Sequence, residues 1–459
     1  MKRIYLDHSA TTPIDKSVLK AMLPYLSDNF GNPSSVHSFG QEARAAVDNA
    51  RHQIAGFLNC KSTEVIFTSG GSESDNLAIR GVINQTLKQV QNDKKIPHIV
   101  TSAFEHHAVL ETIKELEAEG KIEATYIKPN CDGIIKVEKV EKAIKENTVL
   151  VSIMYVNNEI GTAQPIREIG KMIERINRKR LIENGNLYGK KKKEIGNKAI
   201  IQSQISLPAD ASRQAMQAGK PISNFHQLLS KIYFHTDAVQ ATEYFPMDVD
   251  YLHVDLLTLS AHKIYGPKGT GLLYVRTGVP IKHQIVGGGQ EYKKRAGTEN
   301  VAGIVGFAKA VEMAKKSKIK NQKSIRLGSA QPRLIKPKVE ILRNKLIDGI
   351  LKKIPNSFLN GSKEFRSPVN VNISFINAEG EAILLNLDME GIAASTGSAC
   401  TSGSLEPSHV LLSMGLSPKE CHGSIRFTLG RSTTETEIDK VLKVLPAIIK
   451  KLRKMSPFS

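Results

Sequence analysis

Helical and extended patterns alternate along most of the chain, and this alternation restricts the folds open to it more than any other feature. Residues 42–58 have a helical pattern, and a short apolar strand follows at residues 64–68. Further apolar strands are predicted at residues 98–101, 148–153 and 271–275. Strands that alternate with helices usually pair in parallel. The sequence therefore predicts an α/β fold with a mixed, mainly parallel sheet.

The order of elements changes near residue 335. From there a helix precedes a strand at residues 369–375, and more helix and strand follow. A chain of 459 residues is long enough for two domains. We predict an N-terminal segment, a large domain and a smaller C-terminal α+β domain, at residues 1–15, 16–300 and 301–459 respectively.

Composition narrows the class of protein. No apolar run reaches the roughly 18 residues of a membrane span, so we expect no membrane partner. Asp7 interrupts the N-terminus before a signal core could develop, which favours a cytoplasmic protein. The 4 cysteines include no Cys-x-x-Cys pair, so neither a disulfide framework nor a metal site is indicated.

The formal net charge of +19 is concentrated in two segments. Residues 171–231 hold 13 Lys/Arg and 4 Asp/Glu, a net of +9, and residues 315–338 hold 9 Lys/Arg and no acid, another +9. The rest of the chain is close to neutral, so the basicity does not belong to the fold as a whole. We expect two basic surface insertions, with binding of an acidic protein surface or of RNA as the alternative.

A lysine stands at the end of a predicted strand. Lys263 lies in the segment SAHKIYGPKG at residues 260–269, directly after an apolar run. An amine held there can form a Schiff base with a carbonyl compound. Asp237 ends another short apolar run, and a carboxylate in such a place suits a protonated pyridine nitrogen. The pair favours pyridoxal phosphate, whereas a lone surface lysine before a Gly-Pro turn would have no use for Asp237.

Small residues at 69–74 join a strand to a helix. Such a turn lets backbone N–H groups and the helix N-terminus approach a phosphate. A plain helix cap is the alternative, but Ser260 and His262 beside the lysine favour a phosphate. His106 follows another strand and could stack on a cofactor ring. Asn158 follows a strand that ends at Tyr155, where ligand contacts gather in α/β sheets.

Cys400 lies among small polar residues at 395–408. A single thiol is usually a buried structural residue. This stretch offers no apolar neighbours that would bury it, and its composition predicts a mobile loop. We therefore expect Cys400 to be a functional thiol.

Taken in order, these motifs resemble those of the cysteine desulfurases of the IscS/NifS group, in the class V aminotransferase family of fold type I pyridoxal phosphate enzymes. The resemblance runs from YLDHSATTP at residues 5–13 to SIRFTLGR at residues 424–431. It implies removal of sulfur from L-cysteine, which gives L-alanine and a persulfide on Cys400. The sulfur would supply iron–sulfur cluster assembly, tRNA thiolation, or both.

The resemblance implies a role for each residue around the cofactor. Lys263 would bind pyridoxal phosphate and act as the base at the substrate Cα. Asp237 would pair with the pyridine nitrogen, Gln240 would hydrogen-bond the ring hydroxyl, and His106 would stack on the ring and assist proton transfer. The phosphate would be held by Gly71, Ser72, Ser260 and His262.

Three further implications concern substrate and partners. Asn158 would contact cofactor or substrate, and the planar fork of Arg426 would bind the substrate carboxylate. Thr298 resembles a position that reaches the phosphate of the partner subunit, so a homodimer is expected. A sulfur-acceptor protein, such as an iron–sulfur scaffold or a tRNA-thiolation relay protein, is the implied recipient. The resemblance also allows a transient iron–sulfur cluster at Cys400.

Other functions compete with this interpretation. A class V aminotransferase or a selenocysteine lyase would keep the lysine, the aspartate and the phosphate cradle, but an aminotransferase has no use for Cys400 in a flexible loop. From a different class, the chain could be a sulfur-assembly scaffold or an RNA-binding module that uses its basic insertions. The intact set of Lys263, Asp237, His106, Arg426 and Cys400 speaks against that.

The chain departs from the family pattern in three places. His8 stands where a tyrosine is expected. The segment between Gly170 and Asp237 is far longer than the usual link, and residues 315–338 are enlarged. Because both insertions avoid the motifs, we expect catalysis to survive, whereas acceptor recognition could differ.

Overall fold

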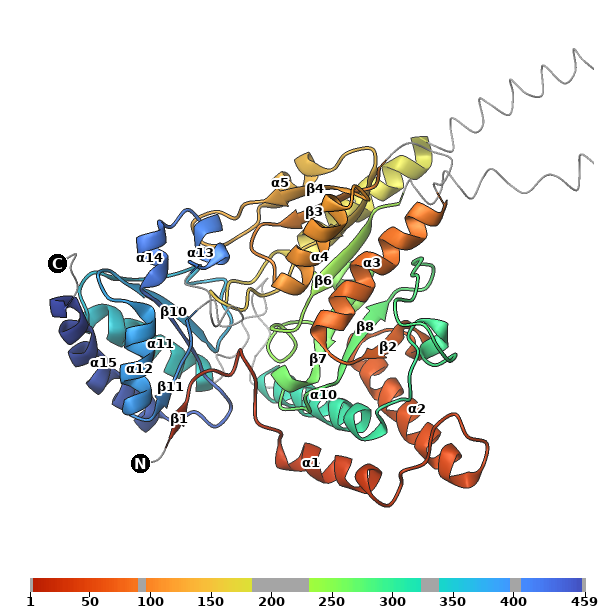
Figure 1. The fold of residues 1–459 in the computed structure, drawn as a ribbon, viewed down its shortest axis with the longest axis horizontal. Helices are drawn as coiled ribbons and strands as arrows, with labels where there is room; N and C mark the ends of the chain where they lie inside the picture. The colour runs from red at the N-terminus through yellow and green to blue at the C-terminus, as the bar shows by residue number, and fades with distance from the viewer. Residues whose placement is uncertain (1–2, 90–95, 184–230, 323–337, 397–405, 456–459) are drawn as a thin grey trace, which may run out of the picture.

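The computed structural model describes residues 3–89, 96–183, 231–322, 338–396 and 406–455 (Figure 1). Seven strands form the central sheet, in the order β2-β8-β7-β6-β5-β3-β4. All neighbours pair in parallel except β8, which is antiparallel to both β2 and β7. The predicted α/β fold with a mixed, mainly parallel sheet is confirmed. The strands are β2 (Val65–Thr68), β3 (His98–Ser102), β4 (Glu123–Ile127), β5 (Thr148–Ser152), β6 (Tyr233–Asp237), β7 (Leu256–Ser260) and β8 (Gly271–Val275).

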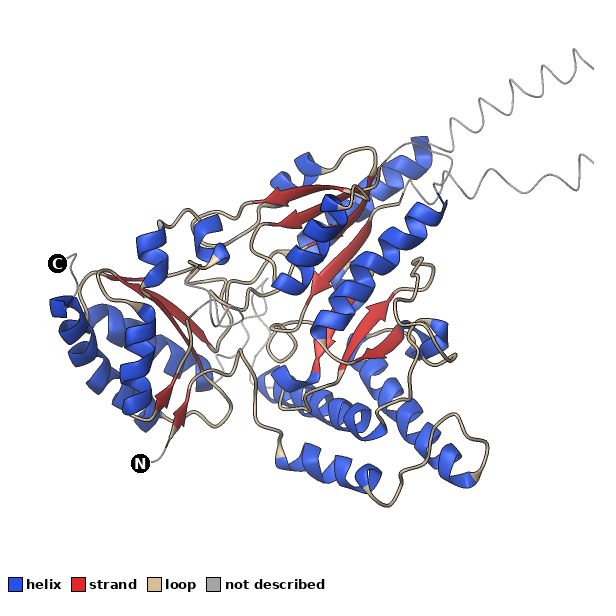
Figure 2. Ribbon diagram, viewed as in Figure 1, coloured by secondary structure: helices blue, strands red, loops and turns tan. Residues whose placement is uncertain are grey.

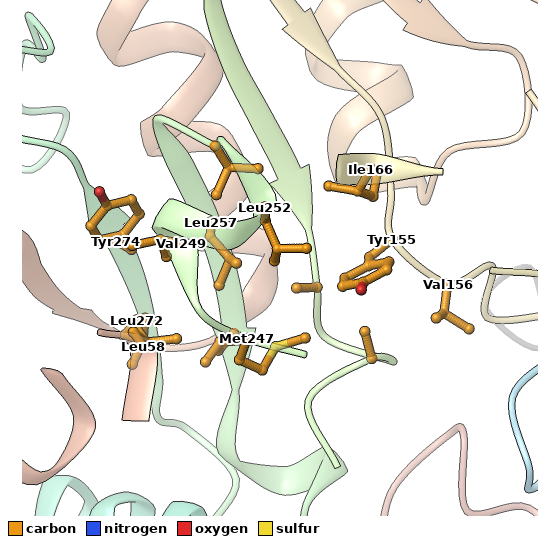
Figure 3. Close-up of a cluster of buried hydrophobic side chains, with 14 of the residues drawn as sticks. Leu58, Tyr155, Val156, Ile166, Met247, Val249, Leu252, Leu257, Leu272 and Tyr274 are labelled. Atoms are coloured by element: carbon orange, nitrogen blue, oxygen red, sulfur yellow. The ribbon is translucent and has the colours of Figure 1, made fainter. Parts of the chain in front are cut away.

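Helices cover both faces of this sheet (Figure 2). Successive strand residues point to opposite faces, so Ile66 and Leu256 join a cluster with side chains of α3 and α4. Phe67 and Leu257 join the opposite cluster, to which α2 and α10 contribute; Figure 3 shows part of this core. The helices are α1 (Lys16–Met22), η1 (Leu23–Leu26), α2 (Ser38–Leu58), η2 (Ser62–Glu64), α3 (Gly71–Gln89), α4 (His107–Ala118), α5 (Val137–Ala143), one over residues 166–183, α9 (Val249–Leu252), η3 (Ala261–Lys263), η4 (Glu291–Lys293) and α10 (Val301–Gln322).

A second core lies in the C-terminal part of the chain. Its antiparallel sheet has the order β12-β10-β9, and a parallel pair joins β1 to β11 beside it. Helices α11, α12 and α15 supply most of the remaining buried apolar side chains. The elements are β1 (Ile4–Tyr5), α11 (Lys338–Lys353), β9 (Ser357–Leu359), β10 (Asn370–Phe375), α12 (Gly380–Met389), β11 (Ile392–Ala393), α13 (His409–Ser413), α14 (Pro418–His422), β12 (Ser424–Thr428) and α15 (Glu435–Met455).

The domain limits stay a prediction. Three segments pack in a hydrophobic core other than the one that these limits would give them. Helix α10 was expected to open the small domain, but buried side chains such as Phe307 lie in the core of the large domain. Ile4 and Leu6 of the N-terminal segment pack in the small core instead. Leu411 of α13 returns to the large core. The two hydrophobic cores therefore do not divide the chain at a single position.

The basic insertions fall largely outside the described residues. Residues 171–183 continue a helix that begins at residue 166, and α10 extends to Gln322. Residues 184–230 and 323–337 are not described, so the surface placement of both insertions stays a prediction. Among the helices of the described ranges, none has the length and apolar content needed to cross a membrane.

Candidate active site

A cavity of about 380 Å³ lies beyond the carboxyl ends of β6 and β7, where open α/β sheets bind ligands. Its wall combines residues of the large domain, the small domain and the N-terminal segment. Most of the predicted site residues line it, and they come together from six segments of the chain. They are Gly71, Ser72, His106, Asn158, Asp237, Gln240, Ser260, His262, Lys263 and Arg426.

Lys263 ends the short η3 turn directly after β7. Its Nζ donates hydrogen bonds to the carbonyl oxygens of Ser9, at 2.5 Å, and Ala10, at 2.8 Å. The amide of Gln240 donates to the same Ser9 carbonyl at 3.1 Å. The N-terminal segment therefore lies over the lysine, and its carbonyl oxygens stabilise the cationic amine.

Asp237 is the last residue of β6 and is buried. Its Oδ1 accepts the N–H of Val239 at 2.9 Å. Burial raises the pKa of Asp237 to about 6, and the hydrogen bond from Val239 and the charge of Lys263 oppose that rise. A cationic ring nitrogen in the cavity would favour the ionised form. The carboxyl group thus suits a protonated pyridine.

His106 caps the N-terminus of α4, and its Nδ1 accepts the N–H of Ala108 at 3.1 Å. A ring nitrogen that accepts from a backbone N–H carries no proton, so the proton of the neutral ring lies on Nε2. Burial, followed by the charge of Lys263, lowers the pKa of His106 to about 4. His106 is therefore neutral at physiological pH and can lie against an aromatic ring without charge repulsion from Lys263.

The residues of the predicted phosphate cradle line the same cavity. Helix α3 begins at Gly71, so its first N–H groups and the positive end of its dipole lie at the cavity. Ser260 Oγ is buried and, among the described residues, has no hydrogen-bond partner. A Cβ at Gly71 would lie 3.2 Å from Val239 Cγ2, which is a tight contact. These features fit a phosphate group.

Arg426, on β12, joins three parts of the chain. Its Nη2 donates to Asp7 Oδ1 at 2.9 Å and its Nη1 to the carbonyl oxygen of Asn158 at 3.0 Å. Its side chain is 3% exposed, and Nε has no partner among the described residues. The guanidinium group therefore lies at the cavity, and two of its nitrogen atoms already donate hydrogen bonds to other parts of the protein.

Of the other two predicted site residues, one is described, and it does not line the cavity. Thr298 is exposed, and its role toward a partner subunit stays a prediction. Cys400 lies in 397–405, outside the described residues. The residues that flank this segment are described: Ser395 exchanges backbone hydrogen bonds with Arg426, at 3.1 and 2.7 Å, and His409 lines the cavity. The described residues on both sides of Cys400 thus lie beside the site.

The other three cysteines do not line the cavity. Burial raises the pKa of the Cys60 thiol and that of the Cys421 thiol to about 12, so both are protonated at physiological pH. Cys421 packs in the large core. Cys131 is exposed at the surface and does not line the cavity.

His8, which departs from the family pattern, is buried against the small domain. Its Nδ1 lies 3.0 Å from the carbonyl oxygen of Thr428, to which it donates. The ring makes an edge contact with Tyr5, with centroids 5.0 Å apart. Gly430 makes room for it, because a Cβ there would lie 2.1 Å from His8 Nε2.

Sequence reasoning missed several residues of the cavity wall. Ser9 and Ala10 line the cavity, and Asp7 pairs with the cavity residue Arg426. All three lie in the segment at residues 5–13, whose sequence alone indicates no role in the site. Asp75 lies four residues after Gly71 on the same helix, so it shares the face turned to the cavity, a spacing that the sequence does show. His409 carries no comparable sequence signal, because its place depends on tertiary packing.

Comparison with known proteins identifies the family. The family model described as aminotransferase class-V matches residues 4–183 and 218–441. This chain belongs to the class-V aminotransferases. A class-V member from Clostridium botulinum, named cysteine desulfurase IscS, is 44% identical over 458 residues, which cover 99% of this chain and 96% of the relative. The IscS of Methanosarcina thermophila is 43% identical over 458 residues, 100% of this chain and 95% of its own.

Solved structures agree with this class-V assignment. A NifS-like protein is 31% identical with a TM-score of 0.76, and the match covers 98% of this chain and 100% of the other. SspA, solved in complex with cysteine, is 32% identical with a TM-score of 0.67, and the match covers 93% and 99%. The predicted fold type I architecture and the predicted IscS/NifS-type cysteine desulfurase are confirmed.

Proposed function

We propose that this cysteine desulfurase binds pyridoxal phosphate on Lys263, takes the sulfur of L-cysteine and carries it on Cys400. The observation that carries the proposal is the position of the flanking residues. Ser395 pairs with the strand residue Arg426 in the cavity wall, and His409 lines the same cavity as Lys263. Cys400 lies between Ser395 and His409 in the sequence, and both of these flanking residues lie at the cavity. SspA, solved with cysteine, supports L-cysteine as the substrate.

Each residue has a task that follows from its surroundings. Pyridoxal phosphate supplies an electron sink for negative charge at the substrate Cα. Lys263 moves the proton at Cα, and Asp237 keeps a positive charge on the ring nitrogen by accepting its N–H. Ser72, Ser260 and the start of α3 would hold the phosphate.

The sulfur step uses the thiolate of Cys400, because a neutral thiol is a poor nucleophile. The thiolate attacks the substrate sulfur, so an S–S bond forms as the C–S bond breaks. The released electron pair stays with the carbon skeleton, which takes up a proton and leaves as alanine. Arg426 would orient the substrate by its carboxylate, in competition with Asp7.

The assembly and the cellular setting belong to the same proposal. Thr298 is exposed on the loop that follows η4, which suits contact with a second subunit in a homodimer. The recipient of the sulfur would be an iron–sulfur scaffold or a tRNA-thiolation relay protein in the cytoplasm. The basic insertions would contribute to its recognition.

The test is production of alanine and sulfide from L-cysteine with a reductant, in wild type, Cys400→Ala and Cys131→Ala. We expect all three proteins to bind the cofactor, as judged by its absorbance. Wild type and the Cys131→Ala control should release both products. The rate of sulfide release by Cys400→Ala should be at least about 100-fold lower than that of wild type, because the nucleophile is missing. If alanine forms only when a keto acid is added, and no sulfide is released, the protein is an aminotransferase and the proposed function is wrong.

A further inference from the structure

A buried carboxyl group lies in the cavity wall beside Asp237, and no step described above uses it. Asp75 comes from the second turn of α3 and is 1% exposed. It lines the same cavity as Asp237 and Lys263. Its Oδ1 has no hydrogen-bond partner among the described residues. An ionised carboxylate in that position would carry an uncompensated charge in a low-dielectric site.

A chain of hydrogen bonds runs across the neighbouring strands β5, β6 and β7 to Asp75. The hydroxyl of Ser152 lies 2.8 Å from His235 Nδ1, and His235 Nε2 lies 3.1 Å from the hydroxyl of Thr258. Thr258 in turn hydrogen-bonds Asp75. Burial lowers the pKa of His235 to about 3, so its ring is neutral and supplies no positive charge, although Nε2 lies 3.6 Å from Asp75 Oδ1. These hydrogen bonds hold the Asp75 carboxyl group in place but bring no positive charge to it.

The charges that face Asp75 are unbalanced. Asp237 at the end of β6 and Glu105 after β3 are both buried carboxyl groups. His106 and His235 are neutral, which leaves Lys263 as the cation of this group within the described part of the chain. Burial is the largest cause that raises the pKa of Asp75, followed by the charge of Asp237; the hydrogen bond from Thr258 opposes this rise, and the charge of Glu105 adds to it. Three carboxylates cannot share one lysine in a buried site without a large repulsion.

We propose that Asp75 is a positioning residue that stays a neutral acid, so that Asp237 carries the negative charge opposite the ring nitrogen of the cofactor. The neutral acid keeps its place through Thr258 and His235. Two adjacent carboxylates would instead share the ring's positive charge and loosen its position. The part of this proposal that concerns the ring rests on the proposed function, whereas the protonation of Asp75 does not.

Infrared spectroscopy at pH 7 tests the protonation directly, because a protonated carboxyl group has a carbonyl stretch that ionised carboxylates lack. We expect acid bands in the wild-type protein, one lost in Asp75→Asn and another lost in the control Glu105→Gln. If Glu105→Gln abolishes every acid band, Asp75 is ionised and the proposal is overturned. This outcome can be read without the Asp75 variant, so it decides the matter even if that variant fails to fold.

Cofactor affinity tests the positioning role. Asparagine reproduces the neutral acid, so we expect Asp75→Asn to bind pyridoxal phosphate within about threefold of wild type, whereas Asp237→Asn should bind at least about 30-fold more weakly. An equal loss in both variants would show that Asp75 acts as a second negative charge, and would overturn the proposal. A wild-type protein that binds no pyridoxal phosphate would contradict the proposed function instead, and the infrared result would still stand.

Discussion

At the residue scale, the site depends on burial more than on direct ion pairs. Asp237, Asp75 and Glu105 are titratable groups in the interior, and for each of them burial is the largest cause of a raised pKa. The carbonyl oxygens of Ser9 and Ala10 accept hydrogen bonds from Lys263. A protonated pyridine ring would favour the ionised form of Asp237, which is the role proposed for that residue.

Glu105 allows a test through pH. Burial raises its pKa to about 8, far above the ordinary value near 4.5. Below about pH 4.5 both the folded and the unfolded chain bind the proton. As the pH rises toward about 8 only the folded chain keeps it, so stability falls across this window.

We expect Glu105→Gln to remove the part of that fall that Glu105 contributes, which amounts to a few kcal/mol at most. The measurement is the free energy of unfolding in urea at pH 5, 6, 7 and 8, for cofactor-free wild type and variant. Parallel curves for the two proteins would show that Glu105 ionises normally in the folded chain.

At the element scale, most strands and helices follow the residue pattern, but one turn does not. Glu291, Tyr292 and Lys293 in η4 all have positive φ, at 46°, 55° and 63°. Such angles are uncommon outside glycine and asparagine. No sequence rule predicts a left-handed turn from these residues, whereas the strand before Ser69 and the helix after it were predictable from apolar spacing.

Tertiary contacts hold this turn. Glu291 is buried and forms a bidentate ion pair with Arg51 of α2, at 2.7 and 2.8 Å. It also accepts the N–H of Phe67 at 2.9 Å, and the Arg51 guanidinium lies over the rings of Phe67 and Tyr292. The partners are more than 200 positions apart in the chain, so local patterns could not reveal them.

Removing Arg51 should therefore destabilise the fold strongly. Arg51→Met leaves a buried carboxylate without its partner, and we expect a loss of about 3–5 kcal/mol in the free energy of unfolding. Arg44→Met is the matched control. Arg44 is half exposed in its ion pair with Glu299, which also lies 3.9 Å from Arg51, so we expect this substitution to cost less than about 1 kcal/mol. Adding Glu291→Gln to Arg51→Met should recover much of the loss. Equal effects of the two arginine substitutions in urea unfolding would refute this role.

At the scale of the whole molecule, the active site depends on both domains. Asp7 from the N-terminal segment, Asn158 from the large domain and Arg426 from the small domain meet in one group of hydrogen bonds. The sequence predicted most of the residues around the cavity, because strand ends in α/β folds converge at one edge. The sequence did not predict that Asp7 would accept a hydrogen bond from Arg426, nor that α10 would pack with the large domain. Both depend on contacts between distant segments of the chain.

The central claim is that Cys400 carries the sulfur, and mass spectrometry tests it most directly. Wild-type protein is treated with L-cysteine, alkylated and digested, and each cysteine peptide is examined for an added sulfur atom. We expect the added sulfur on the peptide that contains Cys400, and none on the peptides of Cys60, Cys131 or Cys421. Alanine formation with added sulfur only on the exposed Cys131, or on no cysteine, would contradict the account.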